Sequence, residues 1–254
     1  MEQLSRNQVG DLRSLGQKKY RESAGEFLLE GVRLCEEALA SPLVITQCIF
    51  SREHAENPIV TQARRRAIPS FQANKTQFEQ FCDSQTPQGL AVVAKIPTDS
   101  EWPIPGNSSQ LILALDRLAD PGNVGTILRS ARWFGVQDVI LSEDCVDVFA
   151  PKVVRSSMGA VCFLRLHRQV NLQSFASHWQ EQNGKIAVLS VVGNSLESFH
   201  RPDTGLMLIT GSEAHGVDPE VEKLGTPLTI VPRGTGESLN AAIATSIGLW
   251  QLTR

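Results

Sequence analysis

Residues 111–141 read LILALDRLADPGNVGTILRSARWFGVQDVIL, and this stretch decides the fold. It begins with the continuous apolar run 111–115, which is typical of a strand buried on both faces of a sheet. A loop with two glycines and a proline follows, then helical spacing over 126–135 and a second apolar run at 139–141. A strand, a helix and a strand in this order predict one unit of a parallel α/β sheet.

Further apolar segments extend this sheet toward the C-terminus. Strands are expected at 186–192, 206–210 and 228–231, and an apolar helix is expected over 238–253. We therefore predict an α/β fold with a parallel sheet for the whole of 110–254. Ligands of such sheets bind outside the carboxyl ends of the strands, where three glycine-bearing loops of this chain are expected.

The first hundred residues predict a smaller α/β domain. The segment EFLLEGVRLCEEAL (26–39) has apolar residues at helical spacing, so one helix is expected there. Strands are expected at 43–50 and 90–94. Proline, glycine and small polar residues then mark a linker. The expected division of the chain is 1–97 for the first domain, 98–109 for the linker and 110–254 for the second domain.

Composition excludes several classes of protein. The 24 Lys and Arg residues nearly balance the 27 Asp and Glu residues, for a net charge of −3, so any contact with nucleic acid must come from local basic patches. No apolar run is long enough to cross a bilayer, and the polar N-terminus has no signal-peptide core, so we expect a cytoplasmic protein without a membrane partner. The five cysteines and five histidines show no metal-binding or disulfide spacing, so no metal is expected.

The first glycine-bearing loop, Asp120 to Gly125, runs into a helix that carries Arg129 and Arg132. These arginines are three residues apart and share one face of the helix. The second loop follows the strand at 206–210 and presents Glu213. Glu213 can pair with a cation or hold an arginine. The alternative is that the loop begins a helix, which Ser212 caps and which has Glu213 in its first turn.

The third loop, 231–240 (VPRGTGESLN), offers main-chain groups that can bind a flat heterocycle, with Ser238 and Asn240 as short polar side chains. Its Gly-x-Gly lacks the third glycine and the context of a dinucleotide-binding fold. The chain also has no P-loop sequence and no Gly-x-Ser-x-Gly elbow of an α/β-hydrolase. Nucleotide hydrolysis on a P-loop and serine hydrolase chemistry are therefore excluded.

Together and in this order, the three loops resemble the three motifs of the SpoU-type (TrmH-like) RNA ribose 2′-O-methyltransferases of the SPOUT superfamily. LDRLADPGNVGTILRSARWFGV resembles the first motif, LITGSEAHGV the second and IVPRGTGESLNAAIA the third. The segment PKVVRSSMGA resembles the stretch between motifs one and two. KKYRESAGEFLLEGVRLCEEAL and TPQGLAVVA resemble the ribosomal-protein-like RNA substrate-binding domain of many members, which places that domain at 1–97.

The resemblance implies S-adenosyl-L-methionine as methyl donor, a ribose 2′-hydroxyl of RNA as acceptor, a deep trefoil knot in the C-terminal domain and a homodimer. The catalytic residues that it implies are Asn123, Arg129, Glu213, Ser238 and Asn240. The cofactor-binding residues that it implies are Thr210, Gly211, Ile230, Val231, Pro232, Ser238 and Leu239.

The third motif departs from the family pattern. Ser238 follows Pro232 by six positions, where many members have seven, so either Ile230 or Val231 is expected over the adenine. In the family Arg129 is the candidate that activates the hydroxyl. A guanidinium stays protonated far above neutral pH, so the second hypothesis is that Arg129 grips a phosphate and stabilises developing negative charge.

RNA contacts are expected at basic patches. The candidates are Lys18, Lys19, Arg21, Arg64, Arg65, Arg66, Lys152 and Arg155. For the triple arginine, ordinary solvated surface is the alternative. Trp133 and Trp250 could stack on bases, but their apolar helices favour burial in the core or a dimer interface.

The auxiliary domain favours ribosomal RNA as the substrate, by analogy with other members. Two alternatives stay open at this point. One is a tRNA ribose 2′-O-methyltransferase, which differs only in its substrate. The other is a catalytically silent RNA-binding protein of ribosome assembly.

Overall fold

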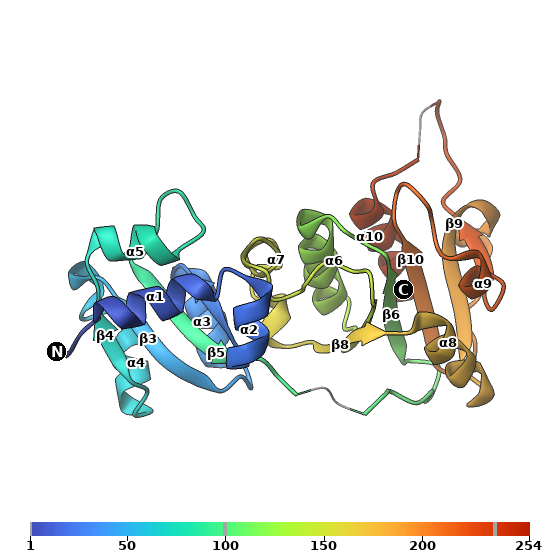
Figure 1. Cartoon of the computed structure of the whole chain (residues 1–254). Helices are drawn as coiled ribbons and strands as arrows, with labels where there is room; N and C mark the ends of the chain where they lie inside the picture. Colours follow the sequence, from blue (N-terminus) through green and yellow to red (C-terminus); the bar gives the residue numbers. More distant parts are fainter. Residues whose placement is uncertain (1, 99–100, 236–237) are drawn as a thin grey trace. The chain divides into compact units, whose positions relative to one another are not determined.

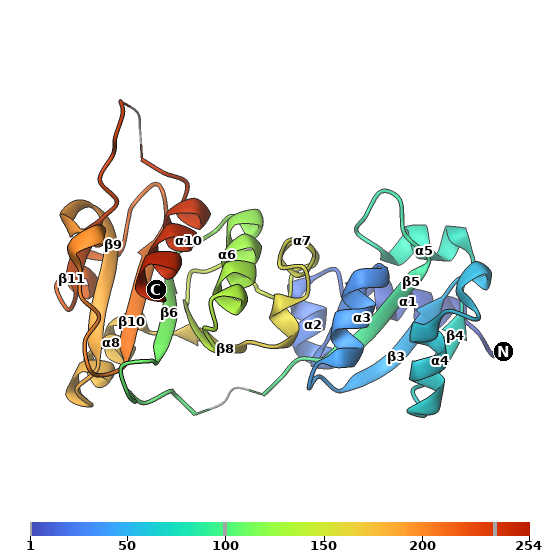
Figure 2. The same cartoon turned by 180° about the vertical axis from the view of Figure 1, so that it is seen from behind.

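The computed structural model of this chain describes residues 2–98, 101–235 and 238–254, and it divides into two compact units (Figures 1 and 2). The first unit is Met1–Thr98 with Asp147–Phe163, and the second is Asp99–Val146 with Leu164–Arg254. Residues 99–100 of the expected linker and Gly236 of the third loop lie outside the described residues. Within the described ranges, no helix has the length and apolar character to span a bilayer.

The first unit is an α/β structure around a five-stranded mixed sheet of order β1-β4-β3-β5-β2. Its elements are β1 Glu2–Gln3, α1 Arg6–Ser14, α2 Lys18–Ala24, β2 Glu26–Glu30, α3 Val32–Ala40, β3 Ile45–Phe50, α4 Pro58–Arg65, β4 Ser70–Gln72, α5 Lys75–Phe81, β5 Leu90–Lys95 and α7 Pro151–Ser156. Helices α1 and α5 pack together through a core that includes Leu12, Phe78 and Val93. The expected strands at 43–50 and 90–94 are therefore confirmed as β3 and β5.

The prediction of one helix over 26–39 is wrong. Residues 26–30 form strand β2, and the helix α3 begins only after Gly31, whose φ of 98° interrupts the helical path. In β2, Phe27 and Leu29 are buried while their neighbours are half-buried, which is the alternation of a strand. The sequence EFLLE suits either period, and antiparallel pairing of β2 with β5 selects the strand.

The segment Asp147–Phe163 belongs to the first unit although the sequence pattern places it within 110–254. Two contacts join the start of this segment to the rest of the first unit. Arg21 is only 3% exposed and its Nη2 lies 2.5 Å from Asp147 Oδ2. The rings of Phe27 and Phe149 lie 4.6 Å apart between centroids. Arg21 is therefore buried, and it does not belong to the accessible basic patch that the sequence predicts.

The second unit contains a six-stranded sheet of order β11-β9-β10-β6-β7-β8, and all of its strand pairs are parallel. Its elements are β6 Leu111–Asp116, α6 Pro121–Trp133, β7 Asp138–Ser142, β8 Arg165–Val170, α8 Leu172–Glu181, β9 Lys185–Ser195, β10 Leu206–Gly211, α9 Pro219–Glu222, β11 Thr226–Thr229 and α10 Ala241–Leu252. The predicted α/β class with a parallel sheet is confirmed. The knot that the resemblance implies stays a prediction.

Helices cover both faces of this sheet (Figure 1). Phe175 and Trp179 of α8 and Val221 of α9 pack in one core with alternate residues of the strands. On the opposite face, α10 contacts β10, since a Cβ at Gly248 would meet Leu208 at 3.3 Å. The register pairs Gly211 with Asp116, so β10 and β6 end side by side. The loops after these two strands therefore leave the sheet at one place.

Candidate active site

Three side chains from the three predicted motifs meet at the carboxyl ends of β6 and β10. Asn123 Nδ2 donates to Glu213 Oε1 at 2.5 Å, and Asn240 Nδ2 donates to Asn123 Oδ1 at 2.9 Å. Asn240 Nδ2 also lies 3.4 Å from Glu213 Oε1. The structure therefore brings together three of the site residues that the resemblance implies, although they lie up to 117 positions apart in the sequence.

Helix capping places two of these side chains. Asp120 caps α6 by accepting a hydrogen bond from Asn123 N at 2.8 Å, and Pro121 occupies the first helical position, where its missing N–H costs nothing. Asn240 caps α10, because its Oδ1 accepts from the main-chain nitrogens of Ala242 and Ile243. An asparagine can accept through Oδ1 and donate through Nδ2, so Asn240 serves the helix and the cluster together.

The carboxylate of Glu213 lies at the N-terminal end of α10. Its Oε1 accepts from Ala241 N at 3.2 Å as well as from the two asparagines. The positive end of the helix dipole and the unpaired N–H groups of the first turn favour an anion at this position. The cluster is thus a fixed set of donors around one negative charge.

A tight turn, not a helix, presents Glu213. Ser212 bridges to Gly216, and Ser212 Oγ accepts from His215 N at 3.3 Å. The expected helix capped by Ser212 is wrong, since the next helix, α9, begins at Pro219. A Cβ on Gly211 would overlap the backbone of Gly216, so the turn can fold back on itself only with glycine at this position.

The remaining cofactor-binding candidates lie in or beside the same loops. Thr210 is buried at the end of β10, and Thr245 Oγ1 of α10 donates to its Oγ1 at 3.0 Å. Ile230 is half-buried, whereas Val231, Pro232, Ser238 and Leu239 are exposed. In the described parts of 230–239, no main-chain N–H or C=O group takes part in a main-chain hydrogen bond outside helices and strands.

These features fit S-adenosyl-L-methionine. Unpaired main-chain donors and acceptors can read the edge of a flat heterocycle, and the exposed apolar side chains of Val231 and Leu239 can cover its faces. No group of three or more metal-ligating side chains occurs among the residues that the structure describes.

Arg129 and Ser238 stand outside the hydrogen-bonded cluster. Both side chains are exposed, and neither has a hydrogen-bond or ion-pair partner within the described ranges. Arg129 follows Asn123 by six residues, which is about 9 Å along the axis of α6. The guanidinium of Arg129 is thus available to a ligand, and the cluster does not orient it directly.

The basic candidates of the first unit differ in whether another group engages their charge. Arg155 pairs with Glu30 and Asp83, Arg66 donates to Leu39 O at 2.7 Å, and Arg64 lies over the ring of Phe50. Lys18 lies 3.7 Å from Glu22 of the same helix. Lys19, Arg65 and Lys152 are exposed. Only the last three have charges that no contact within the described residues engages.

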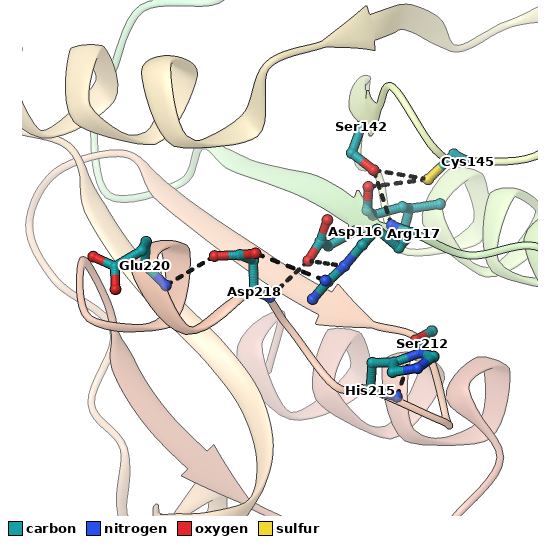
Figure 3. A network of polar contacts seen from close by, with 9 residues as sticks. Asp116, Arg117, Ser142, Cys145, Ser212, His215, Asp218 and Glu220 are labelled. Carbon is teal, nitrogen blue, oxygen red and sulfur yellow. Dashed lines mark hydrogen bonds and ion pairs between the residues drawn. The ribbon is translucent and has the colours of Figure 1, made fainter.

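A second polar network, which the sequence patterns did not predict, joins the same two loops. Asp116, Arg117 and Asp218 meet beside the end of β6 (Figure 3). Asp116 Oδ2 accepts a hydrogen bond from Asp218 N at 2.7 Å. A charged pair directly after a buried strand was the signal in the sequence, because a strand end is where charged groups of a parallel sheet collect.

Comparison with known proteins gives the family. The SpoU rRNA Methylase family matches residues 110–250, which is more than half of the chain. This chain belongs to the SpoU rRNA methylase family. In this SpoU family member, residues 6–92 also match a second family model, the MRM3-like substrate binding domain.

Two curated relatives and one solved structure resemble the chain over nearly its full length. A protein of Synechocystis named an uncharacterized tRNA/rRNA methyltransferase is 33% identical, over 97% of this chain and 90% of its own. The 23S rRNA (guanosine(2553)-2′-O)-methyltransferase RlmP of Bacillus subtilis is 28% identical, over 99% and 98%. The AdoMet-bound rRNA methyltransferase of Sinorhizobium meliloti is 25% identical with a TM-score of 0.87, over 99% and 96%.

Proposed function

We propose that this protein transfers a methyl group from S-adenosyl-L-methionine to a ribose 2′-hydroxyl of ribosomal RNA. The observation that carries the proposal is the cluster of Asn123, Glu213 and Asn240 at the ends of β6 and β10. The relative from Bacillus subtilis, named for 2′-O-methylation of 23S rRNA, supports the substrate. We place the reaction in the cytoplasm because the proposed substrate is ribosomal RNA.

The proposed cofactor contacts are made by the loops after β10 and β11 and before α10. Thr210, Gly211, Ile230, Val231, Pro232, Ser238 and Leu239 hold the donor, whose sulfonium supplies an electrophilic methyl group when it is bound. Transfer requires in-line alignment of the ribose oxygen with the methyl carbon, and alignment by itself supplies much of the acceleration.

Arg129 is proposed to act on the RNA. Its guanidinium is exposed and unpaired within the described residues, so it can grip a phosphate next to the target ribose. A fixed positive charge there also stabilises the negative charge that develops on the ribose oxygen. Because a guanidinium stays protonated, we favour this role over that of a general base.

A methyl-transfer assay with labelled S-adenosyl-L-methionine tests the proposal. The purified protein should label ribosomal RNA, at sites that resist alkaline cleavage, and should leave tRNA unlabelled. Arg129→Ala should abolish labelling and keep the affinity for the donor within about twofold. Arg52→Ala, which removes an exposed arginine far from these loops in sequence, is the matched control and should keep full activity.

Three results would change the assignment. If only tRNA is labelled, the substrate is tRNA and not ribosomal RNA. Donor binding without transfer to either RNA would make the protein a silent RNA-binding member. Full turnover by Arg129→Ala would remove Arg129 from the mechanism.

RNA binding by the first unit is proposed to use its accessible positive charges. Lys19, Arg65 and Lys152 are the exposed members of the predicted patches whose charged groups have no hydrogen-bond, ion-pair or ring partner among the described residues. The match of residues 6–92 to a substrate binding domain supports this assignment. Binding through phosphate contacts should weaken as salt rises.

We also propose that a second copy of this chain covers the outer face of α6 and α10. An apolar groove is lined by Thr126 of α6, by Phe134 directly after this helix, and by Ile243 and Trp250 of α10. Trp250 is 51% exposed, and nearby Trp133 is 84% exposed, so neither is buried in the core of one chain. An aromatic groove of this kind is typical of a homodimer interface.

Sedimentation equilibrium tests the dimer. The wild type should sediment as a dimer and Ile243→Glu as a monomer, because a charge in the apolar groove is costly when a partner covers it. Val44→Glu, at an exposed apolar position of the first unit, is the matched control and should remain dimeric. A monomeric wild type at micromolar concentration would refute the proposal.

A further inference from the structure

Arg117 has a backbone conformation that an arginine rarely adopts. It follows β6 directly, and its φ is 55°, in the left-handed region. Glycine tolerates this region without cost, whereas a residue with a Cβ is strained there. Strain of this kind persists only where the surrounding structure imposes it, and it is concentrated at functional sites.

The side chain of Arg117 links the ends of two motifs (Figure 3). Its Nε lies 3.2 Å from Asp116 Oδ2, and its Nη1 lies 3.7 Å from Asp218 Oδ2. Its main-chain nitrogen donates to Ser142 Oγ at 2.9 Å. Asp218 ends the turn that presents Glu213 and caps helix α9. One guanidinium therefore bridges the start of the first motif to the residue that follows the second motif.

The side chain of Arg117 is also unfavourable in one respect, because it buries donors that no acceptor among the described residues satisfies. Nε and Nη2 of Arg117 are buried, and neither has a hydrogen-bond partner in the part of the chain that the structure describes, although Nε lies within ion-pair distance of Asp116. Leaving a buried N–H without an acceptor is unfavourable. Glycine would remove both the backbone strain and the unpaired donors, but it would also leave the buried carboxylate of Asp116 without its counter-charge.

We propose that Arg117 is a positioning residue for methyl transfer. It neutralises Asp116 and Asp218 together and so anchors the turn 211–218 at its second end, while the hydrogen bonds of Glu213 anchor the tip. With both anchors, the Glu213 carboxylate stays where Asn123 and Asn240 donate to it. The inference rests on the proposed function of this cluster.

The decisive variant is Arg117→Gly, because glycine suits the backbone and removes only the guanidinium. We expect kcat for RNA methylation to fall at least tenfold, with the KM for RNA unchanged and the protein still folded at the assay temperature. Arg117→Lys, which keeps the charge, should recover part of kcat. Asn183→Gly is the matched control, since Asn183 also has a positive φ, of 65°, and it should keep wild-type kcat.

Hydrogen exchange of the main-chain amides of 212–218 supplies a readout independent of activity. Arg117→Gly should speed exchange in this turn and leave that of α8 unchanged. Wild-type kcat with wild-type exchange would overturn the proposal, as would a loss of kcat accompanied by equally fast exchange in α8. If the wild type methylates no RNA, the proposed function fails, while the exchange rates still decide whether Arg117 anchors the turn.

Discussion

Replacing Asn240 with aspartate should destabilise the active-site cluster through charge repulsion. Aspartate still caps α10, since it keeps the acceptor oxygen. It loses the donor to Asn123 Oδ1, which costs about 1 kcal/mol. It also places an oxygen close to the present position of Nδ2, which lies 3.4 Å from Glu213 Oε1. Two unit charges at that separation repel by about 1 kcal/mol in water, and both side chains are exposed.

The summed cost of about 2 kcal/mol should lower the thermal midpoint of Asn240→Asp by about 4–8 °C. Asn240→Ser keeps a capping oxygen and adds no charge, so it should lose only about half as much. Adding Glu213→Gln to Asn240→Asp removes the repulsion and supplies a new donor, and it should recover most of the loss. High salt should narrow the gap between the aspartate and serine variants. Equal midpoints for these two variants at low salt would refute the reasoning.

Two further predictions concern the second unit. Gly211→Ala should lower the free energy of unfolding by about 1–3 kcal/mol, because the added Cβ overlaps the turn's own backbone. The same variant should bind the methyl donor more weakly in calorimetry. Gly234→Ala is the control and should unfold like the wild type, because a Cβ there meets no atom within 4 Å. Burial raises the pKa of Asp138, but hydrogen bonds from His167 and Arg165 outweigh burial and hold that pKa below its usual 3.8. The stability from this carboxylate is therefore present above pH 3.8 and is lost as the pH falls through the lowered pKa. In acid titrations monitored by circular dichroism, Asp138→Asn should be less stable than the wild type above pH 3.8, and the difference should shrink below it. A gap that stays constant to pH 2 would contradict this explanation.

Local patterns in the sequence determine much of this protein. The buried runs at 111–115 and 206–209 are apolar at every position, so they predict central strands without knowledge of their partners. The glycine at 211 indicates a tight turn for reasons confined to a few residues. The expectation of a loop over Asp120 to Gly125 is wrong, because Asp120 caps α6 and the helix begins at Pro121. The motifs and their order then indicate the family, and Asn123, Glu213 and Asn240 do meet.

Tertiary structure alone decides the remaining features. EFLLE becomes a strand because β5 is available to pair with it. Arg21 is buried because Asp147, 126 residues away, lies against it. The strained Arg117 is held by Asp218, which the sequence places 101 positions further on. Periodicity and propensity report on neighbours along the chain, whereas ion pairs and strand pairs depend on which distant segments the topology brings together. A local pattern therefore cannot specify them.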